Sequence, residues 1–366
     1  MTATTDESEL PGQRRPRGGG DLEGYVTVPA FAEPHAHLDK AFLAERIPNP
    51  TGDLLGAILA MNAARDTITV ADTAERAERA ARLLASNGCT AIRTHADVTE
   101  GNGLISVEAL VDVRERLRDL VDIQIVALTG RPSLGEPGAD VRALLAEAIA
   151  MGVDLVGGAP HLEDDVHAAN EQLLAIAADA GLGVDLHTDE TLDPRICGLA
   201  DLAERVIASG FPHGVTASHC VSLGVLPEAR QCEVAERVAA AGIHVVALPQ
   251  TNLFLQGRGV PSSVPRGLTA VRVLREAGVH VAAGADNLQD PFNPVGRGDP
   301  LETASLMVTA GHLLPEDAMA TVTTEARHVL GLPTVGDIDR VAIRAGSVRE
   351  AIAFGPADRI VLRSGR

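Results

Sequence analysis

The chain has 366 residues and a formal net charge of −19 at pH 7. That acidity disfavours nucleic acid and anionic membranes as partners, and no run of about 18 apolar residues predicts a membrane span. Hydrophobic residues make up 45% of the chain, yet it contains no Trp, 1 Tyr and 6 Phe. Ala, Val, Leu and Ile must therefore build the core, which favours a parallel sheet covered by helices.

The cysteines indicate a reducing compartment. Cys89, Cys197, Cys220 and Cys232 are scattered and form no C-x-x-C pair. A disulfide framework is not indicated, and the N-terminus lacks the apolar core of a secretion signal. We therefore expect a cytoplasmic protein.

Taken in chain order, residues 1–21 are polar and predict a disordered tail. Short apolar runs then alternate with stretches of helical period. Eight strands are predicted, at residues 25–31, 90–94, 123–128, 155–158, 183–186, 215–218, 244–248 and 280–283. Helices are predicted at residues 73–86, 104–120, 139–150, 166–180, 199–208, 228–241 and 269–277, with closing helices at 301–311 and 316–330.

Several of these helices end in a glycine, as expected of left-handed C-caps: Gly88, Gly152, Gly181, Gly242 and Gly278. Eight strand–helix units without a glycine-rich phosphate loop favour an α/β fold of the (β/α)8 barrel type. We assign residues 22–332 to the barrel and residues 333–366 to a reduced β appendage. Its strands at 340–343 and 359–363 have few N-terminal residues with which to pair.

Polar residues follow the predicted strands where a barrel places its active site. His35 and His37 lie two residues apart, so their side chains point to the same side. Other strand ends carry His95 on the second strand, His187 on the fifth, His219 on the sixth and Asp286 on the eighth. One histidine at a strand end is most often structural, but this pattern predicts a metal site.

Three imidazoles and one carboxylate suit zinc or iron, with a position left for water whose pKa the metal lowers. Glu190 follows His187 by three residues and is the predicted general acid and base, while His219 would hold the hydroxide. His95 either supports a ligand or closes the barrel floor, and His161 either lines the pocket or is structural. The only lysine, Lys40, follows the first strand, which disfavours a carbamylated bridge and favours one metal ion.

The sequence resembles bacterial cytosine deaminase, of the amidohydrolase superfamily, over about residues 25–330. The resemblance is carried by the segments EPHAHLD (33–39), RTHADV (93–98), DIQIVA (122–127), DLHTDE (185–190), VTASH (215–219), LQGR (255–258) and GAD (284–286). It implies a (β/α)8 barrel with one metal held by His35, His37, His187 and Asp286. It also implies Glu190 as proton shuttle and His219 on the hydrolytic water, with Asp286 able to relay a proton.

The departures from this family fall in the substrate pocket. The family's cytosine-reading glutamine should fall near Gly130, where this chain has no glutamine. Asn287 replaces the second aspartate that follows the metal-binding one in the family. The segments DNLQD (286–290) and GRGD (296–299) instead resemble N-isopropylammelide amidohydrolase, which lacks an equivalent of Glu190. Candidate substrate-binding residues are Gly130, His161, Gln250, Asn252, Gln256 and Asn287.

We therefore predict a metal-dependent hydrolase that deaminates a small nitrogen heterocycle such as a pyrimidine, pterin or triazine, and that acts as a homo-oligomer. One alternative is an amidohydrolase that releases an alkylamine or opens a cyclic amide. Another is a non-catalytic binding protein on the same scaffold, which an intact ligand set disfavours.

Overall fold

Eight parallel strands follow one another in sequence order in a single sheet of the computed structural model. The structure describes residues 22–364, so the predicted tail at residues 1–21 lies outside the described residues. The strands are β2 Phe31–Ala36, β3 Cys89–Val98, β4 Asp122–Thr129, β5 Leu155–Gly158, β6 Gly183–Thr188, β7 Val215–His219, β8 His244–Ala247 and β9 Val281–Ala283.

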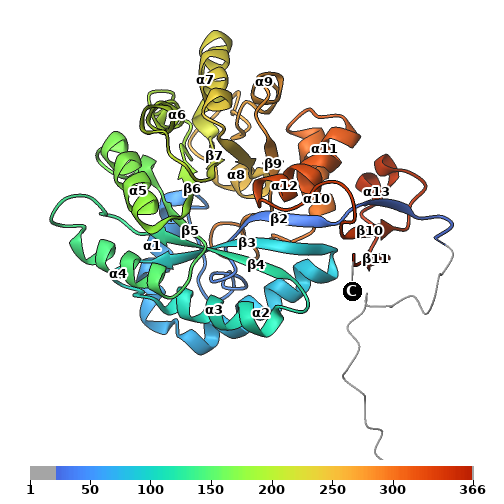
Figure 1. The fold of residues 1–366 in the computed structure, drawn as a ribbon, viewed down its shortest axis with the longest axis horizontal. Coiled ribbons are helices and arrows are strands. Elements are labelled where there is room, and N and C mark those ends of the chain that lie inside the picture. The colour runs from blue at the N-terminus through green and yellow to red at the C-terminus, as the bar shows by residue number, and fades with distance from the viewer. Residues whose placement is uncertain (1–21, 365–366) are drawn as a thin grey trace, which may run out of the picture.

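The segment after β9 closes this sheet into a ring against β2. Asp286 forms a parallel bridge with Ala36. Its N–H donates to the His35 carbonyl at 3.1 Å, and its carbonyl accepts from the His37 N–H at 3.2 Å. Helices surround the ring on the outside (Figure 1). The predicted (β/α)8 barrel is confirmed.

The helices largely follow the prediction. They are α1 Leu54–Ala64, α2 Val70–Ser86, α3 Ile105–Leu117, α4 Ala139–Ala150, α5 Val166–Ala180, α6 Gly198–Ser209, α7 Glu228–Ala240, α8 Pro249–Leu255, α9 Val271–Glu276, α10 Pro300–Thr309, α11 Pro315–Val322, α12 Thr324–Val329 and α13 Val348–Phe354. None of these described helices is long and apolar enough to cross a membrane. The five predicted C-cap glycines all have positive φ, between 67° and 98°.

Three helices were not predicted: α1, α8 and α13. Helix α1 reads LLGAILAMNAA, with apolar residues on every side and therefore no stripe to recognise. The predicted closing helix at 316–330 is two helices, α11 and α12, which break at Thr323, where φ is −122° and ψ is −95°.

The first predicted strand, at residues 25–31, is wrong in its bounds. Strand β1 Val26–Pro29 pairs with β10 Arg340–Ile343, which pairs with β11 Arg359–Leu362, all antiparallel. Only at Phe31 does the chain enter the barrel as β2. Pro29 has no N–H to donate to a sheet. The Ala30 N–H donates to the carbonyl of Asp339, the residue just before β10, at 2.9 Å.

This three-stranded sheet therefore joins strands from near both ends of the described chain. A small β appendage forms as expected, and the few N-terminal residues before the barrel are enough to supply its third strand. The boundary between residues 332 and 333 stays a prediction.

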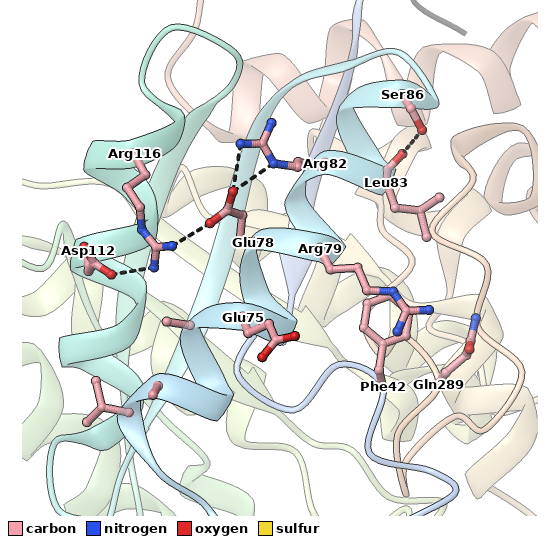
Figure 2. Close-up of a pocket in the computed structure, with 13 residues that line it drawn as sticks. Phe42, Glu75, Glu78, Arg79, Arg82, Leu83, Ser86, Asp112, Arg116 and Gln289 are labelled. Carbon is pink, nitrogen blue, oxygen red and sulfur yellow. Dashed lines mark hydrogen bonds and ion pairs between the residues drawn. The ribbon is translucent and has the colours of Figure 1, made fainter. Parts of the chain in front are cut away.

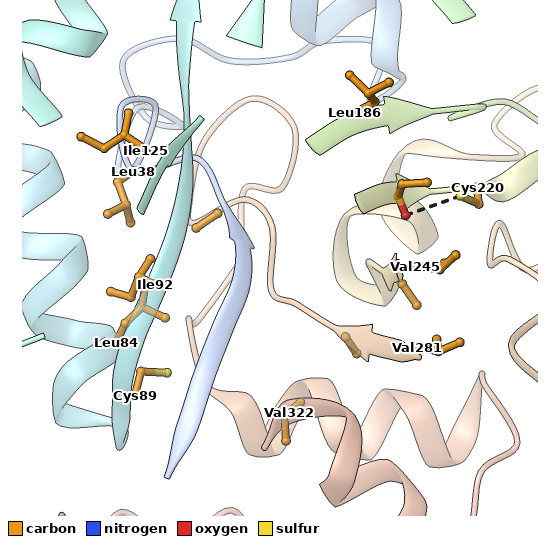
Figure 3. Packing of buried hydrophobic residues seen from close by; sticks show 14 of the residues in the cluster. Leu38, Leu84, Cys89, Ile92, Ile125, Leu186, Cys220, Val245, Val281 and Val322 are labelled. Carbon is orange, nitrogen blue, oxygen red and sulfur yellow. Dashed lines mark hydrogen bonds between the residues drawn. The ribbon is translucent and has the colours of Figure 1, made fainter. Parts of the chain in front are cut away.

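The core between sheet and helices is aliphatic, as the composition requires. Leu84 of α2, Ile92 of β3 and Val281 of β9 belong to one continuous cluster (Figure 3). Each such side chain contributes roughly 1.5–3 kcal/mol when fully buried. This packing fixes the positions of the strand ends, which carry the site residues.

Candidate active site

His35, His37 and Asp286 meet at the carboxyl end of β2. His35 Nε2 lies 3.6 Å and His37 Nε2 3.4 Å from Asp286 Oδ1. The backbone of Asp286 has φ 63°, a left-handed conformation that is rare for a residue with a side chain. The hydrogen bonds that close the barrel hold this conformation, and they place the carboxylate beside the two imidazoles.

His187, at the end of β6, completes the group from across the barrel. Its Nε2 lies 3.1 Å from His37 Nε2. The ligand atoms of His35, His37 and His187 all lie within 4.8 Å of one another. Burial, and then neighbouring charged groups, lower the pKa of each imidazole well below its usual value, so all three are neutral, as metal ligands must be.

These residues fit a divalent metal ion. Ligand atoms about 2.1 Å from a tetrahedral metal are about 3.4 Å apart, close to the separations found here. Both carboxylate oxygens of Asp286 and the Nε2 of His35 are buried without a hydrogen-bond partner in residues 22–364. Burial raises the pKa of Asp286 well above its usual value. A cation at this point would satisfy all these atoms.

His219 and Asn252 form a hydrogen-bonded pair beside this group. Asn252 Nδ2 donates to the Gly267 carbonyl at 3.1 Å, so its Oδ1 faces His219 Nδ1 at 3.0 Å. His219 must therefore carry its proton on Nδ1, which leaves Nε2 as an acceptor. That Nε2 is buried and has no partner in the described part of the chain.

Glu190 lies on the loop after β6. Its Oε1 is 3.7 Å from His219 Nδ1, and the residue is 6% exposed. Burial raises the pKa of Glu190 to about 8. The carboxylate of the preceding Asp189 accepts from the N–H groups of Gly198 and Leu199, which ties the loop to the start of α6.

Two further histidines lie beside the predicted ligands. The ring centroid of His95 is 4.0 Å from that of His35, and neither of its nitrogens has a hydrogen-bond partner among the described residues, although Nε2 lies 3.8 Å from Asp185 Oδ1. His161 Nδ1 donates to the His187 carbonyl at 3.0 Å, which leaves its Nε2 as a buried acceptor without a partner there. His161 is thus brought to the site rather than left apart from it.

The remaining predicted substrate-binding residues already contact protein groups. Gln250 Nε2 donates to Thr303 Oγ1 at 2.7 Å, while its Oε1 is unpartnered within the described chain. Gln256 Nε2 donates to the Glu190 carbonyl at 3.3 Å. A Cβ on Gly130 would lie 2.6 Å from Thr99 Cγ2.

Asn287 uses both ends of its amide within the protein. Its Nδ2 donates to Asp290 Oδ2 at 2.8 Å, and its Oδ1 accepts from Thr251 at 3.2 Å. Its side chain therefore shapes the loop after β9.

Sequence reasoning missed the polar residues that hold the site from within the strands. Asp185, Ser218 and Arg93 are buried beneath the histidines. Lys40 pairs with Asp97, with Nζ 2.7 Å from Oδ1. The available signal was polar residues inside otherwise apolar strands.

A large groove on the outside of the barrel is separate from this site. It lies between α2 and α3, and none of the predicted site residues lines it. Glu78 accepts hydrogen bonds from Arg82 and Arg116, and Arg79 stacks 3.9 Å over the Phe42 ring (Figure 2). The charges of Glu78 and Arg116 are thus already matched, and we assign the groove no part in the chemistry.

Comparison with known proteins identifies the family. The sequence model of the amidohydrolase family matches residues 44–340. The chain belongs to the amidohydrolase family. The predicted superfamily and enzyme class are therefore confirmed.

Particular amidohydrolases are similar along most of the chain. The pterin deaminase of Rhizobium rhizogenes is 36% identical over 359 residues, covering 94% of this chain and 81% of that protein. The N-isopropylammelide isopropyl amidohydrolase of a Pseudomonas species is 25% identical, covering 94% and 86%. The solved structure of 5-methylcytosine deaminase from Klebsiella pneumoniae with 5-fluorocytosine has a TM-score of 0.86 and 31% identity, covering 99% of this amidohydrolase and 90% of that chain.

Proposed function

We propose that this amidohydrolase is a metal-dependent deaminase that removes an exocyclic amino group from a pterin or a cytosine-like pyrimidine as ammonia. The observation that carries the proposal is the convergence of three neutral imidazoles with the Asp286 carboxylate, beside the buried Glu190. The similarity to a pterin deaminase and to a 5-methylcytosine deaminase supports the same reaction.

His35, His37, His187 and Asp286 would hold one zinc or iron ion. When bound, the ion supplies Lewis acidity that lowers the pKa of a water molecule and makes hydroxide available near neutral pH. His219 Nε2, which has no hydrogen-bond partner in the described residues, would accept a hydrogen bond from that water, because Asn252 holds the proton on Nδ1.

Glu190 moves the protons. With a pKa near 8 it is mostly protonated at neutral pH, so it donates to the ring nitrogen while the water oxygen adds to the adjacent carbon. The resulting carboxylate then receives a proton from that oxygen and passes it to the departing amino group. The carbon–nitrogen bond breaks, ammonia leaves and the ring carbon keeps the oxygen as a carbonyl. Glu190 would regain its own proton from the next water molecule when that water becomes hydroxide.

The substrate would be read from the loops after the strands. We propose His161 and Gln250 as readers, because each has a buried acceptor atom without a protein partner in the described residues. Asn252, Gln256 and Asn287 support this pocket through the protein groups they already hold. Gly130 packs against Thr99 so closely that a Cβ there would lie 2.6 Å from Thr99 Cγ2, so a glycine at this position lets the loop after β4 approach Thr99.

The proposal is tested on the purified protein by measuring metal content and product release together. We expect about one zinc or iron per chain, and ammonia release from pterin, cytosine or 5-methylcytosine. N-Isopropylammelide is the comparison substrate, with ammonia and isopropylamine measured separately. Isopropylamine release without deamination of the other rings would favour the alkylamine reaction. No bound metal and no turnover with added metal would favour a binding protein.

We also propose a cytoplasmic homo-oligomer. Cytoplasmic location is supported by four cysteines that form no disulfide in the structure. Light scattering on the purified protein tests the oligomer, and a single-chain mass would contradict it. Cell fractionation with a periplasmic marker tests the location.

A further inference from the structure

A line of buried polar groups runs from His35 into the barrel. His35 Nδ1 is 2.9 Å from Ser218 Oγ, and Ser218 Oγ is 2.9 Å from Asp185 Oδ1. The other oxygen of Asp185 accepts from Arg93 Nη1 at 2.9 Å. His35, Ser218 and Asp185 are fully buried, and Arg93 is 4% exposed. The four residues come from β2, β7, β6 and β3, so the line spans the barrel.

The direction of each hydrogen bond follows by elimination. A guanidinium can only donate, so Asp185 Oδ2 accepts from Arg93, and Asp185 Oδ1 accepts from the Ser218 hydroxyl. Ser218 has one hydroxyl proton, which must go to Asp185. Ser218 Oγ can then only accept from His35, whose Nδ1 must carry the proton. A neutral imidazole has one N–H, so the lone pair of His35 is on Nε2, 3.6 Å from Asp286 Oδ1.

We propose that Arg93, Asp185 and Ser218 form a positioning chain that fixes the tautomer and ring plane of His35 and so sets the metal affinity of the site. The inference rests on the proposed function, since it requires metal binding by His35. None of the three residues is among the proposed metal ligands His35, His37, His187 and Asp286. They act through the imidazole, as outer partners of metal-bound histidines commonly do.

Arg93, at the end of the positioning chain away from His35, is held by the end of α12 and the residue after it. Arg93 Nη2 donates to the Val329 carbonyl, the last residue of α12, at 3.0 Å. Arg93 Nε donates to Gln124 Oε1 at 3.0 Å, and Gln124 Nε2 donates to the Leu330 carbonyl at 2.9 Å. The guanidinium thus has a fixed orientation. The position of α12 on one side of the barrel is thereby linked to the orientation of a metal-binding ring on the other.

The test compares zinc affinity in metal-depleted Ser218 variants by competition with a chromophoric chelator. Ser218→Ala removes the acceptor for His35 Nδ1–H, and we expect zinc to bind about 10- to 100-fold more weakly. Ser218→Thr keeps the hydroxyl and should bind within about 3-fold of the unchanged protein. Thr129→Val is the matched control: it also removes a buried hydroxyl from a barrel strand, one that donates to the Gly157 carbonyl at 3.0 Å, and Thr129 belongs neither to the positioning chain nor to the proposed ligands.

A second readout does not depend on metal. In metal-free protein labelled with ¹⁵N-histidine, NMR should show the Nδ1–H tautomer of His35, and a mixture of tautomers in Ser218→Ala. If that variant fails to fold, Ser218→Cys provides the comparison, because a thiol is a weak acceptor of similar size. It should weaken zinc binding in the same direction.

The outcomes separate the two proposals. Equal zinc affinity in the unchanged protein and in Ser218→Ala or Ser218→Cys would overturn the positioning chain and leave the proposed function standing. Equal losses in Ser218→Ala and Thr129→Val would also overturn it, because the effect would then be structural. If the unchanged protein binds no divalent metal, the proposed function fails first and the positioning chain fails with it.

Discussion

Glu190→Gln should have opposite effects on activity and on stability. Gln has the same shape as a protonated Glu but cannot transfer a proton. We expect kcat to fall about 100- to 10,000-fold, which corresponds to about 3–5 kcal/mol of transition-state stabilisation. Metal content should stay unchanged, because Glu190 is not among the proposed ligands.

The stability effect follows from the buried carboxyl. Burial raises its pKa from 4.5 to about 8, so the unfolded chain is ionised between these pH values while the folded protein is protonated. Protonated Glu190 contributes its full stability below pH 4.5. The free energy of unfolding then decreases as pH rises from 4.5 through about 8. At pH 8 the loss is at most about 5 kcal/mol, and we expect Glu190→Gln to recover about 1–3 kcal/mol in metal-free protein.

The assays are steady-state ammonia release and urea unfolding of chelator-treated protein at pH 5 and pH 8. Glu100→Gln, in an exposed turn, is the matched control and should change neither activity nor stability by more than about 0.5 kcal/mol. Full activity of Glu190→Gln would refute its role in proton transfer. A variant that is no more stable than the unchanged protein at pH 8 would refute the buried, protonated carboxyl.

Three further predictions concern residues around the site and the barrel floor. Asn252→Ala removes the group that holds the proton on His219 Nδ1, so kcat should fall about 10-fold while metal content, measured by atomic emission, is unchanged. Gly130→Ala places a Cβ 2.6 Å from Thr99 Cγ2, and this overlap should lower the free energy of unfolding by about 1–3 kcal/mol. Adding Thr99→Ser removes that methyl group and should restore part of the lost stability, as measured by urea titration. Burial, and then the neighbouring His328 and His280, lower the pKa of His244 to about 4. As pH falls from 6.5 to 4 the unfolded chain therefore binds a proton that the folded chain does not, and the free energy of unfolding falls. His244→Gln should reduce the dependence of the free energy of unfolding on pH over this window, measured by urea titration.

The strand ends show how far sequence reasoning reached. His35, His37, His187 and Asp286 were predicted to converge, because side chains at the ends of parallel barrel strands share one rim, and the structure brings them together. The bounds of the first strand could not be predicted. Residues 25–31 form one apolar run, and only pairing with β10, more than 300 residues away, assigns Val26–Pro29 to the other sheet.

The sequence alone determined the barrel, the family and the residue types that meet at its rim, because these follow from local periodicity and from short motifs. Only the tertiary structure decided how each side chain is used. Asn252 and Asn287 have the same side chain, yet one holds His219 and the other holds Asp290. Ser218 supports His35 from a strand 183 residues further along the chain. Hydrogen bonding, tautomer and burial depend on neighbours that the chain order does not place side by side, so they become visible only when the barrel is closed.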